Sequence, residues 1–249
     1  ASRTNLEMPD VQQELLAELA KTGKPIVLLN FAGRPTVLSW ENEHIPAIMN
    51  VWFGGSEVGD ALCDVIFGDK SPSGKLTTSM PKTTGQEPLY YNHQNTGRPV
   101  PDDNEKFAKF ASNCLDVSNG PLYPFGYGLS YTTFEYGDLK LSSHEVNTDD
   151  WKITATINLK NTGSRDADEI VQLYIRDMVA SISRPVKELK GFQRIHLAAG
   201  ESREISFDIT PEMLKFYNAE LKHVIEPGDF QIMVGGNSKE VKTQNLTVK

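Results

Sequence analysis

The hydrophobic residues in the first third of the chain follow helical and strand patterns in turn. Val11, Leu15 and Leu19 recur every four residues, which predicts a helix. Continuous apolar runs within 26–29 and 47–53 predict two strands that are buried on both faces. Helices that alternate with buried strands are typical of a parallel sheet with helices packed on it.

A second helix is predicted after the break Gly54-Gly55-Ser56, because residues 58–66 carry an apolar face that stops before Gly68. Residues 75–80 predict one more strand. A segment of about 80 residues with only two or three strands cannot cover both faces of a parallel sheet. We therefore expect residues 1–82 to be the latter half of an α/β sandwich whose first half lies upstream.

Residues 83–133 follow neither pattern. They hold five Pro, five Gly and five of the eight Tyr of the chain. Loops longer than about 12–15 residues are usually functional or disordered. We expect this segment to be an ordered connecting loop that clamps the two halves together.

From Phe134 onward the apolar residues alternate with polar ones, as in half-buried strands. The predicted strands lie within 153–159, 171–175, 192–197, 205–209, 224–225, 230–234 and 245–248. About seven short strands in one domain fit an immunoglobulin-like β-sandwich. The sequence thus predicts an α/β region over 1–82 followed by an all-β region over 134–249.

Composition and charge narrow the function classes. The chain has 249 residues and a formal net charge of −8, so it offers no basic surface for nucleic acid. No apolar run approaches the roughly 20 residues of a membrane helix, and the N-terminal residues lack the pattern of a signal peptide. We expect neither a nucleic-acid partner nor insertion into a membrane.

The sequence contains no pattern that identifies a catalytic site or a metal site. The five histidines form no pair at ligand spacing, so we predict neither a metal site nor a cofactor. Ser56 follows two glycines but lacks the closing glycine of a nucleophile elbow, which favours a helix N-cap. Cys63 lies among apolar residues of the second helix and is predicted to be a small core residue. The carboxylates Glu41, Glu43, Glu57 and Asp60 show no spacing that assigns a catalytic role.

The tyrosines of the connecting loop allow two interpretations. Their flat apolar faces and polar rims suit a sugar-like ligand. Alternatively, they join one region of the chain to the other, which we favour for most of them because a long ordered loop must bury something. The tyrosines concerned are Tyr90, Tyr91, Tyr123, Tyr127 and Tyr131.

Several stretches, taken in order along nearly the whole chain, resemble glycoside hydrolase family 3, most of all its periplasmic β-glucosidase branch. The stretch Gly120–Phe134 (GPLYPFGYGLSYTTF) resembles the junction between the last two domains of that family. The other matching stretches are Gly23–Val27, Phe31–Pro35, Trp52–Glu57, Phe67–Asp69, Pro72–Leu76, Tyr90–Pro99 and Ser183–Phe192.

The resemblance implies a three-part secreted or periplasmic enzyme with a TIM-type barrel, an α/β sandwich and a fibronectin type III-like sandwich. The chain would hold half of the second part and all of the third. In the family the nucleophilic Asp sits on the barrel, and the acid/base Glu precedes the segment that resembles residues 1–4. We therefore expect no catalytic residue in this chain and no glycosidase activity from it alone. Its parent would be a retaining exo-β-glycosidase acting on terminal β-glucosyl residues of a β-glucoside or oligosaccharide.

The resemblance also suggests substrate-binding positions. Arg3 would lie close behind the acid/base residue, and the loop with Asn113 and Asp116 would approach the substrate entrance; Tyr123 belongs to the aromatic loop that suits a sugar. The chain's partners would be the missing barrel and the first half of the sandwich, and the existence of a homodimer stays open. A non-catalytic carbohydrate-binding or adhesion module remains the alternative, since the sandwich fold hosts many functions. An enzyme fragment, unlike such a module, must expose an apolar sheet edge where the rest docked.

Overall fold

The computed structural model describes residues 3–103 and 108–249, which form two compact units. The α/β unit consists of Ala1–Phe67, Thr78–Tyr90 and Arg98–Pro124, and the β-sandwich unit of Gly68–Thr77, Tyr91–Gly97 and Phe125–Lys249. This division differs from the predicted boundaries after residues 82 and 133, because Gly68–Thr77 belongs to the β-sandwich unit and the connecting segment contributes to both units. Within the described residues, no helix is both long enough and apolar enough to cross a membrane.

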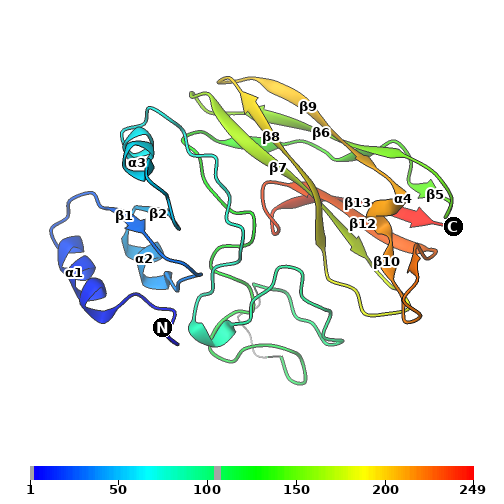
Figure 1. The fold of residues 1–249 in the computed structure, drawn as a ribbon, viewed down its shortest axis with the longest axis horizontal. Coiled ribbons are helices and arrows are strands. Elements are labelled where there is room, and N and C mark those ends of the chain that lie inside the picture. Colours follow the sequence, from blue (N-terminus) through cyan, green and yellow to red (C-terminus); the bar gives the residue numbers. More distant parts are fainter. Residues whose placement is uncertain (1–2, 104–107) are drawn as a thin grey trace. The chain divides into compact units, whose positions relative to one another are not determined.

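The α/β unit is built around two short parallel strands (Figure 1). Its elements are α1 (Asp10–Ala20), β1 (Val27–Asn30), α2 (Ser39–His44), β2 (Ala47–Asn50), α3 (Val58–Ile66) and the short 3₁₀ helix η1 (Thr84–Gln86). The register pairs Val27 with Ala47 and Asn30 with Asn50. The helices α1 and α3 and the strands β1 and β2 match the sequence pattern, whereas α2 was not predicted. The predicted α/β character is confirmed.

Three details of this unit differ from the predictions. β1 and β2 are half-buried rather than buried on both faces, because a two-stranded sheet leaves both its outer edges and much of its faces without cover. β2 ends at Asn50, and Trp52 takes a left-handed backbone conformation with φ of 55°. Residues 75–80 form no strand; only Met80 makes an isolated bridge, with Tyr123.

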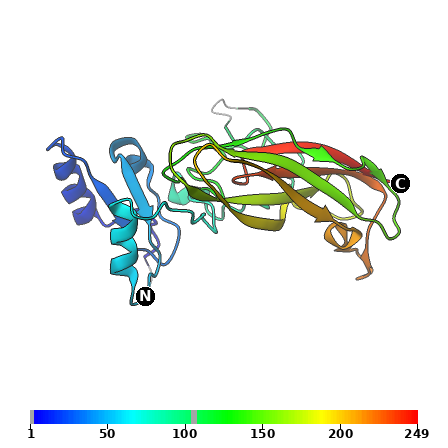
Figure 2. The ribbon, with the colours of Figure 1, turned by 90° about the horizontal axis from the view of Figure 1, so that it is seen from above.

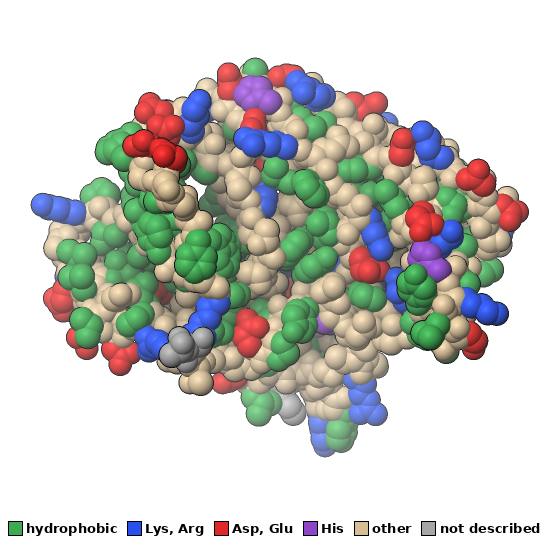
Figure 3. Space-filling view, in the orientation of Figure 1, with side chains coloured by type: hydrophobic (Ala, Val, Ile, Leu, Met, Phe, Trp, Pro, Cys, Tyr) green, Lys and Arg blue, Asp and Glu red, His purple; other side chains and the backbone are tan. Residues whose placement is uncertain are grey.

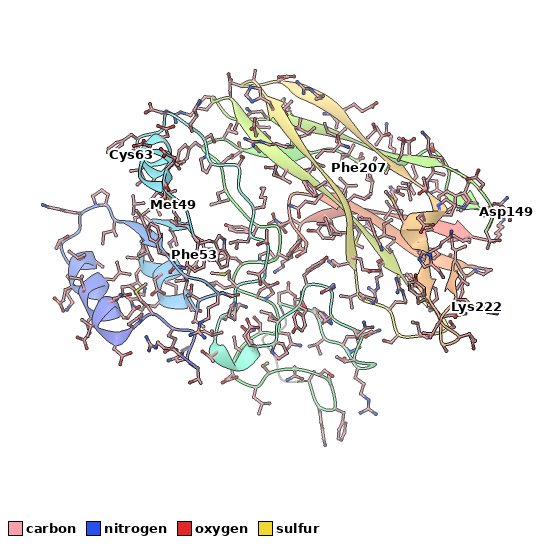
Figure 4. All side chains as sticks on the ribbon, in the orientation of Figure 1. Met49, Phe53, Cys63, Asp149, Phe207 and Lys222 are labelled. Atoms are coloured by element: carbon pink, nitrogen blue, oxygen red, sulfur yellow. The ribbon has the colours of Figure 1, made fainter. Side chains whose placement is uncertain are left out.

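The predictions for α3 also need correction. The N-cap residue is Glu57 rather than Ser56, and no side chain caps the helix. Cys63 lies exposed on α3 (Figure 4), and none of the helix residues is fully buried. Cys114 is exposed as well. The apolar face of α3 exists as predicted, but this chain does not supply enough neighbouring structure to bury it.

The β-sandwich unit contains two facing sheets (Figure 2). One sheet has the strand order β5-β13-β12-β7-β8, and the other has β3-β6-β4 with β9 also paired to β6. The strands are β3 (Phe134–Tyr136), β4 (Lys140–Leu141), β5 (Glu145–Val146), β6 (Ile153–Asn161), β7 (Ala167–Asp177), β8 (Glu188–Leu197), β9 (Ser202–Ile209), β12 (Gly228–Gly235) and β13 (Val241–Val248). A turn of helix, α4 (Pro211–Leu214), precedes the small hairpin of β10 (Phe216–Tyr217) and β11 (His223–Val224).

The core of this unit lies between the two sheets. Alternate residues of β6 point into it, so Ile153, Ile157 and Leu159 are buried as the period of two predicts. Phe207 of β9 lies in the same core (Figure 4), opposite apolar residues of β7 and β12. The predicted β-sandwich is therefore confirmed.

The segment Gly68–Thr77 attaches to the sandwich through the backbone. Leu76 N–H donates to the Tyr127 carbonyl at 2.7 Å, and Gly126 N–H donates to the Leu76 carbonyl at 2.7 Å. Gly126 has a φ of +80°, a conformation that L side chains rarely adopt. The glycine-rich stretch 126–128 therefore forms a turn that holds this segment in place.

Candidate functional site

An open groove with a volume of about 640 Å³ runs between α1 and β1 of the α/β unit. Leu15 and Leu19 line it from the helix, and Leu28 and Leu29 line it from the strand. Leu15 is 60% exposed although it lies on the apolar face of α1. An apolar groove of this kind is suited to receive further protein structure.

One end of the groove is polar and lies at the carboxyl end of β1. The Asn30 amide donates to Asn50 Oδ1 at 2.8 Å and to Thr36 Oγ1 at 2.9 Å. The Arg34 guanidinium donates to the backbone carbonyls of Arg3 and Asn5. In open α/β sheets, ligands bind outside the carboxyl ends of the strands. Arg3 lines the groove and is exposed.

Exposed aromatic residues follow both strands. Phe31 comes directly after β1, and Phe53, which is 87% exposed, lies three residues beyond β2 (Figure 4). The ring of Phe53 lies so close to Gly33 that a Cβ there would come within 2.9 Å of it. Hydrophobic side chains gather on the face of this unit that Figure 3 shows. Phenylalanines exposed to this extent indicate an interaction surface.

The remaining predicted substrate-binding residues lie on the loop 108–123. The Asn113 amide donates to the Cys114 carbonyl at 3.1 Å, while its Oδ1 is buried without a hydrogen-bond partner. Asp116 is exposed. The Tyr123 hydroxyl donates to Asn42 Oδ1 at 2.7 Å. Arg3, the 113–116 loop and Tyr123 thus occupy separate places in the α/β unit, and nothing in these contacts assigns them a common ligand.

Tyr91 serves packing in the β-sandwich unit. Its ring stacks on Phe125 with centroids 4.2 Å apart and meets Tyr174 edge-on at 5.9 Å. Its hydroxyl accepts a hydrogen bond from Leu189 N–H at 3.2 Å. Tyr90 is exposed instead. Tyr91 therefore packs within the β-sandwich unit, and these contacts do not join it to the α/β unit.

Glu41 on α2 differs from the other carboxylates named from the sequence, because it is buried. Its side chain is only 2% exposed, and burial, reinforced by the negative charge of Glu7, raises the pKa of its carboxyl. A raised pKa suits a general acid, but a carboxyl this deeply buried cannot reach a substrate. Glu43, Glu57 and Asp60 are exposed.

A metal centre finds no support in the described part of the chain. No group of three or more His, Cys, Asp or Glu residues within 3–103 and 108–249 could hold an ion.

Comparisons with known proteins agree with this architecture. Residues 1–131 match the model of the glycosyl hydrolase family 3 C-terminal domain, and residues 169–238 match the fibronectin type III-like domain. A periplasmic beta-glucosidase of Salmonella typhimurium is 49% identical over 97% of this chain and 31% of its own length. A beta-xylosidase of Formosa agariphila is 42% identical over 99% of this chain and 33% of its own length.

Solved structures give the same result. The crystal structure of a beta-glucosidase from Listeria innocua in complex with gluconolactone has a TM-score of 0.92 at 40% identity, over 98% of this chain and 33% of that one. A beta-glucosidase from Kluyveromyces marxianus has a TM-score of 0.79 at 32% identity, over 99% of this chain and 29% of that one. The chain thus spans about a third of the length of the relatives it matches. It belongs to glycosyl hydrolase family 3, with residues 1–131 matching the C-terminal domain of that family and residues 169–238 matching a fibronectin type III-like domain.

Proposed function

We propose that this chain is the C-terminal region of a retaining exo-β-glycosidase of the β-glucosidase type, which removes terminal β-D-glucosyl residues. The observation that carries this proposal is the 49% identity to a periplasmic beta-glucosidase across 97% of the chain. The same relative supports a periplasmic or secreted location for the parent enzyme. Similarity to a beta-xylosidase makes terminal β-xylosyl residues the second candidate substrate.

In this proposal both catalytic carboxylates belong to the rest of the enzyme. A retaining glycosidase needs two carboxyl groups about 5–5.5 Å apart, one as nucleophile and one as acid and base. Glu41 is buried, so it does not reach a substrate, and Glu43, Glu57 and Asp60 are exposed. We assign none of them a catalytic role. The chain alone would therefore not hydrolyse glycosides.

The chain's own role would be to complete the α/β sandwich and to support the wall of the active site. Its partners would be the barrel and the first half of the sandwich, joined at the groove between α1 and β1. The exposed Leu15 and Phe53 and the incomplete two-stranded sheet support this role. They also speak against a free-standing binding module, which has no need of half a parallel sheet.

An assay of the purified chain with p-nitrophenyl β-D-glucoside and β-D-xyloside tests whether the chain alone lacks glycosidase activity. We expect no release of nitrophenol above that of an empty-vector preparation. Turnover of either glycoside would contradict the absence of both catalytic carboxylates from this chain.

A further inference from the structure

A second concave site lies in the β-sandwich unit, where β7 ends and the loop to β8 begins. Residues 176–184, Val186 and Asn95 line a pocket of about 320 Å³. Two segments that are distant in the sequence meet there, since Val186 N–H donates to the His93 carbonyl at 2.9 Å. This volume lies at the small end of ligand pockets, so the pocket suits a small molecule.

The guanidinium of Arg176 is an accessible cation without a counter-ion in this pocket. Among the residues that the structure describes, it forms neither a hydrogen bond nor an ion pair, and none of its nitrogens is fully buried. Arg184 also lines the pocket, but it donates to Glu188 Oε2 at 2.8 Å and its guanidinium lies 4.7 Å from the centre of the Phe216 ring. Arg176, unlike Arg184, is therefore free to bind a ligand.

Strand β7 holds Arg176 on the outer face of its sheet. Successive residues of a strand point to opposite faces, and the preceding residue, Ile175, belongs to the core between the two sheets. Tyr174, on the same face as Arg176, is fully buried beneath the ring of Tyr91. Arg176 itself is half-buried and lies opposite Gln231 of β12 in the register. A side chain carried by a paired strand is positioned more precisely than one carried by a loop.

The acidic groups around the pocket are covered or bound. Asp177 Oδ2 is buried, and burial, opposed by the charge of Arg184, raises the pKa of the Asp177 carboxyl. The Glu226 carboxylate accepts hydrogen bonds from Ser181 N–H at 2.8 Å and from the Ser181 hydroxyl at 2.6 Å. The Glu188 carboxylate binds Arg184. A ligand in the pocket would therefore meet an uncompensated positive charge.

An oxyanion group matches the donors that the pocket offers. A guanidinium presents its N–H groups as a planar fork, which fits two oxygens of a carboxylate or a phosphate. Asn95 is exposed beside it in the lining, and its Oδ1 accepts from Gly97 N–H at 3.4 Å. The amide N–H groups of Asn95 have no partner among the described residues, so they add further donors. Met178 and Val179 supply an apolar wall.

We propose that this pocket binds the oxyanion group of a small molecule between the Arg176 guanidinium and the Asn95 amide. A carboxylate and a phosphate share this chemistry. The site goes beyond the function proposed above, because its residues belong to the β-sandwich unit and no glycoside is cleaved there.

Methionine methyl signals report binding at this pocket. Met178 lines the pocket and is 39% exposed, whereas Met80 is buried in the α/β unit. In the chain labelled with ¹³C-methyl methionine, we expect D-glucuronate and inorganic phosphate to shift the Met178 signal in a saturable way at millimolar concentration, and to leave Met80 unchanged. D-glucose, which has the ring of glucuronate without the carboxylate, should give no saturable shift.

Each outcome of this titration decides a point. Saturable binding of one anion alone supports the site and identifies the source of the oxyanion as a carboxylate or a phosphate. A shift with glucose equal to that with glucuronate, or no saturable shift with either anion, would overturn the proposal.

The variant Arg176→Gln removes the charge and the planar fork. We expect it to bind both anions at least about tenfold more weakly. Arg203→Gln is the matched control, because it changes the net charge equally at an arginine outside the pocket, whose guanidinium binds Glu201 at 2.6 Å. An unchanged circular dichroism spectrum shows that each variant keeps its fold.

Undiminished binding by Arg176→Gln would refute the site. Equal weakening by Arg203→Gln would also refute it, because net charge rather than the pocket would then attract the anions. Since binding is measured without turnover, failure here does not touch the proposed glycosidase function.

Discussion

Lys75 and Glu169 form a buried ion pair in the β-sandwich unit, with Lys75 Nζ 3.1 Å from Glu169 Oε2 and side chains only 13% and 7% exposed. Each of the two groups also has a further hydrogen-bond partner. Lys75 Nζ donates to the Gly128 carbonyl at 2.8 Å, and the Tyr136 hydroxyl donates to Glu169 Oε1 at 2.9 Å. Burial and the Glu169 carboxylate together raise the pKa of Tyr136, so it stays a donor. The pair ties the segment Gly68–Thr77 to strand β7.

Lys75→Met should destabilise the chain by about 3–5 kcal/mol, because it leaves the Glu169 carboxylate buried without its counter-ion. Urea denaturation followed by circular dichroism measures this loss. The matched control is Lys152→Met, whose partner Asp208 forms an exposed pair at 3.0 Å. That change should cost no more than about 1 kcal/mol. Equal losses in the free energy of unfolding for the two variants would show that the buried ion pair stabilises the chain no more than the exposed pair.

Gly126→Ala should destabilise the chain by at least about 1–2 kcal/mol, since an L residue pays that much in the left-handed conformation. A Cβ at this position would also lie 2.1 Å from Gln172 Oε1. Gly59 on α3 offers the control, because a Cβ there meets nothing within 4 Å and alanine favours helices. If Gly126→Ala unfolds at the same urea concentration as Gly59→Ala, the turn does not require glycine.

Glu41→Gln should raise the melting temperature at pH 7. Burial raises the carboxyl pKa from its ordinary value of 4.5, so the folded state binds the proton more tightly than the unfolded state. The wild type therefore loses stability as the pH rises above 4.5, while the neutral glutamine does not. For a chain of this size, each 1 kcal/mol of stability corresponds to about 2–4 °C in melting temperature.

Melting curves at pH 4 and pH 7 check the sign of this effect. The difference between Glu41→Gln and the wild type should be small at pH 4 and larger at pH 7. Glu43→Gln, a change at an exposed neighbour, should alter neither curve. A variant that melts below the wild type at pH 7 would show that the Glu41 carboxylate stabilises the fold.

Leu15→Asp should leave the fold of the chain intact and weaken its association with the rest of the enzyme. Leu15 is largely exposed in this structure and lines the groove, so a charge there costs little until the groove is covered. Co-purification with the co-expressed remainder of a family 3 enzyme measures the association. Glu14→Gln, at an exposed position of the same helix outside the groove lining, serves as the control. If Leu15→Asp co-purifies as well as the wild type, the groove is not part of the interface.

The secondary structure followed from the sequence wherever a periodic pattern was satisfied inside the chain. β6 alternates buried and outward residues because the facing sheet belongs to the same chain. The prediction that Cys63 is a core residue was wrong because the apolar face of α3 lacks cover within this chain. The pattern of apolar residues shows which face of a helix or strand can be buried, but not whether the structure that would cover this face is present.

The sites were harder to predict than the fold. Glu41 looked like an ordinary surface carboxylate, because its burial depends on tertiary packing around α2. Arg3, Asn113, Asp116 and Tyr123 came from the family resemblance and aromatic pattern, and their roles in substrate binding stay predictions.

The central claim is that this chain supplies the supporting C-terminal part of a β-glucosidase whose catalytic carboxylates lie elsewhere. Its most direct test is co-expression with the part of the Salmonella typhimurium relative that lies outside the region matched by this chain. We predict that neither part hydrolyses p-nitrophenyl β-D-glucoside alone and that the two together do so. Activity of this chain alone, or full activity of the Salmonella part without it, would contradict the account.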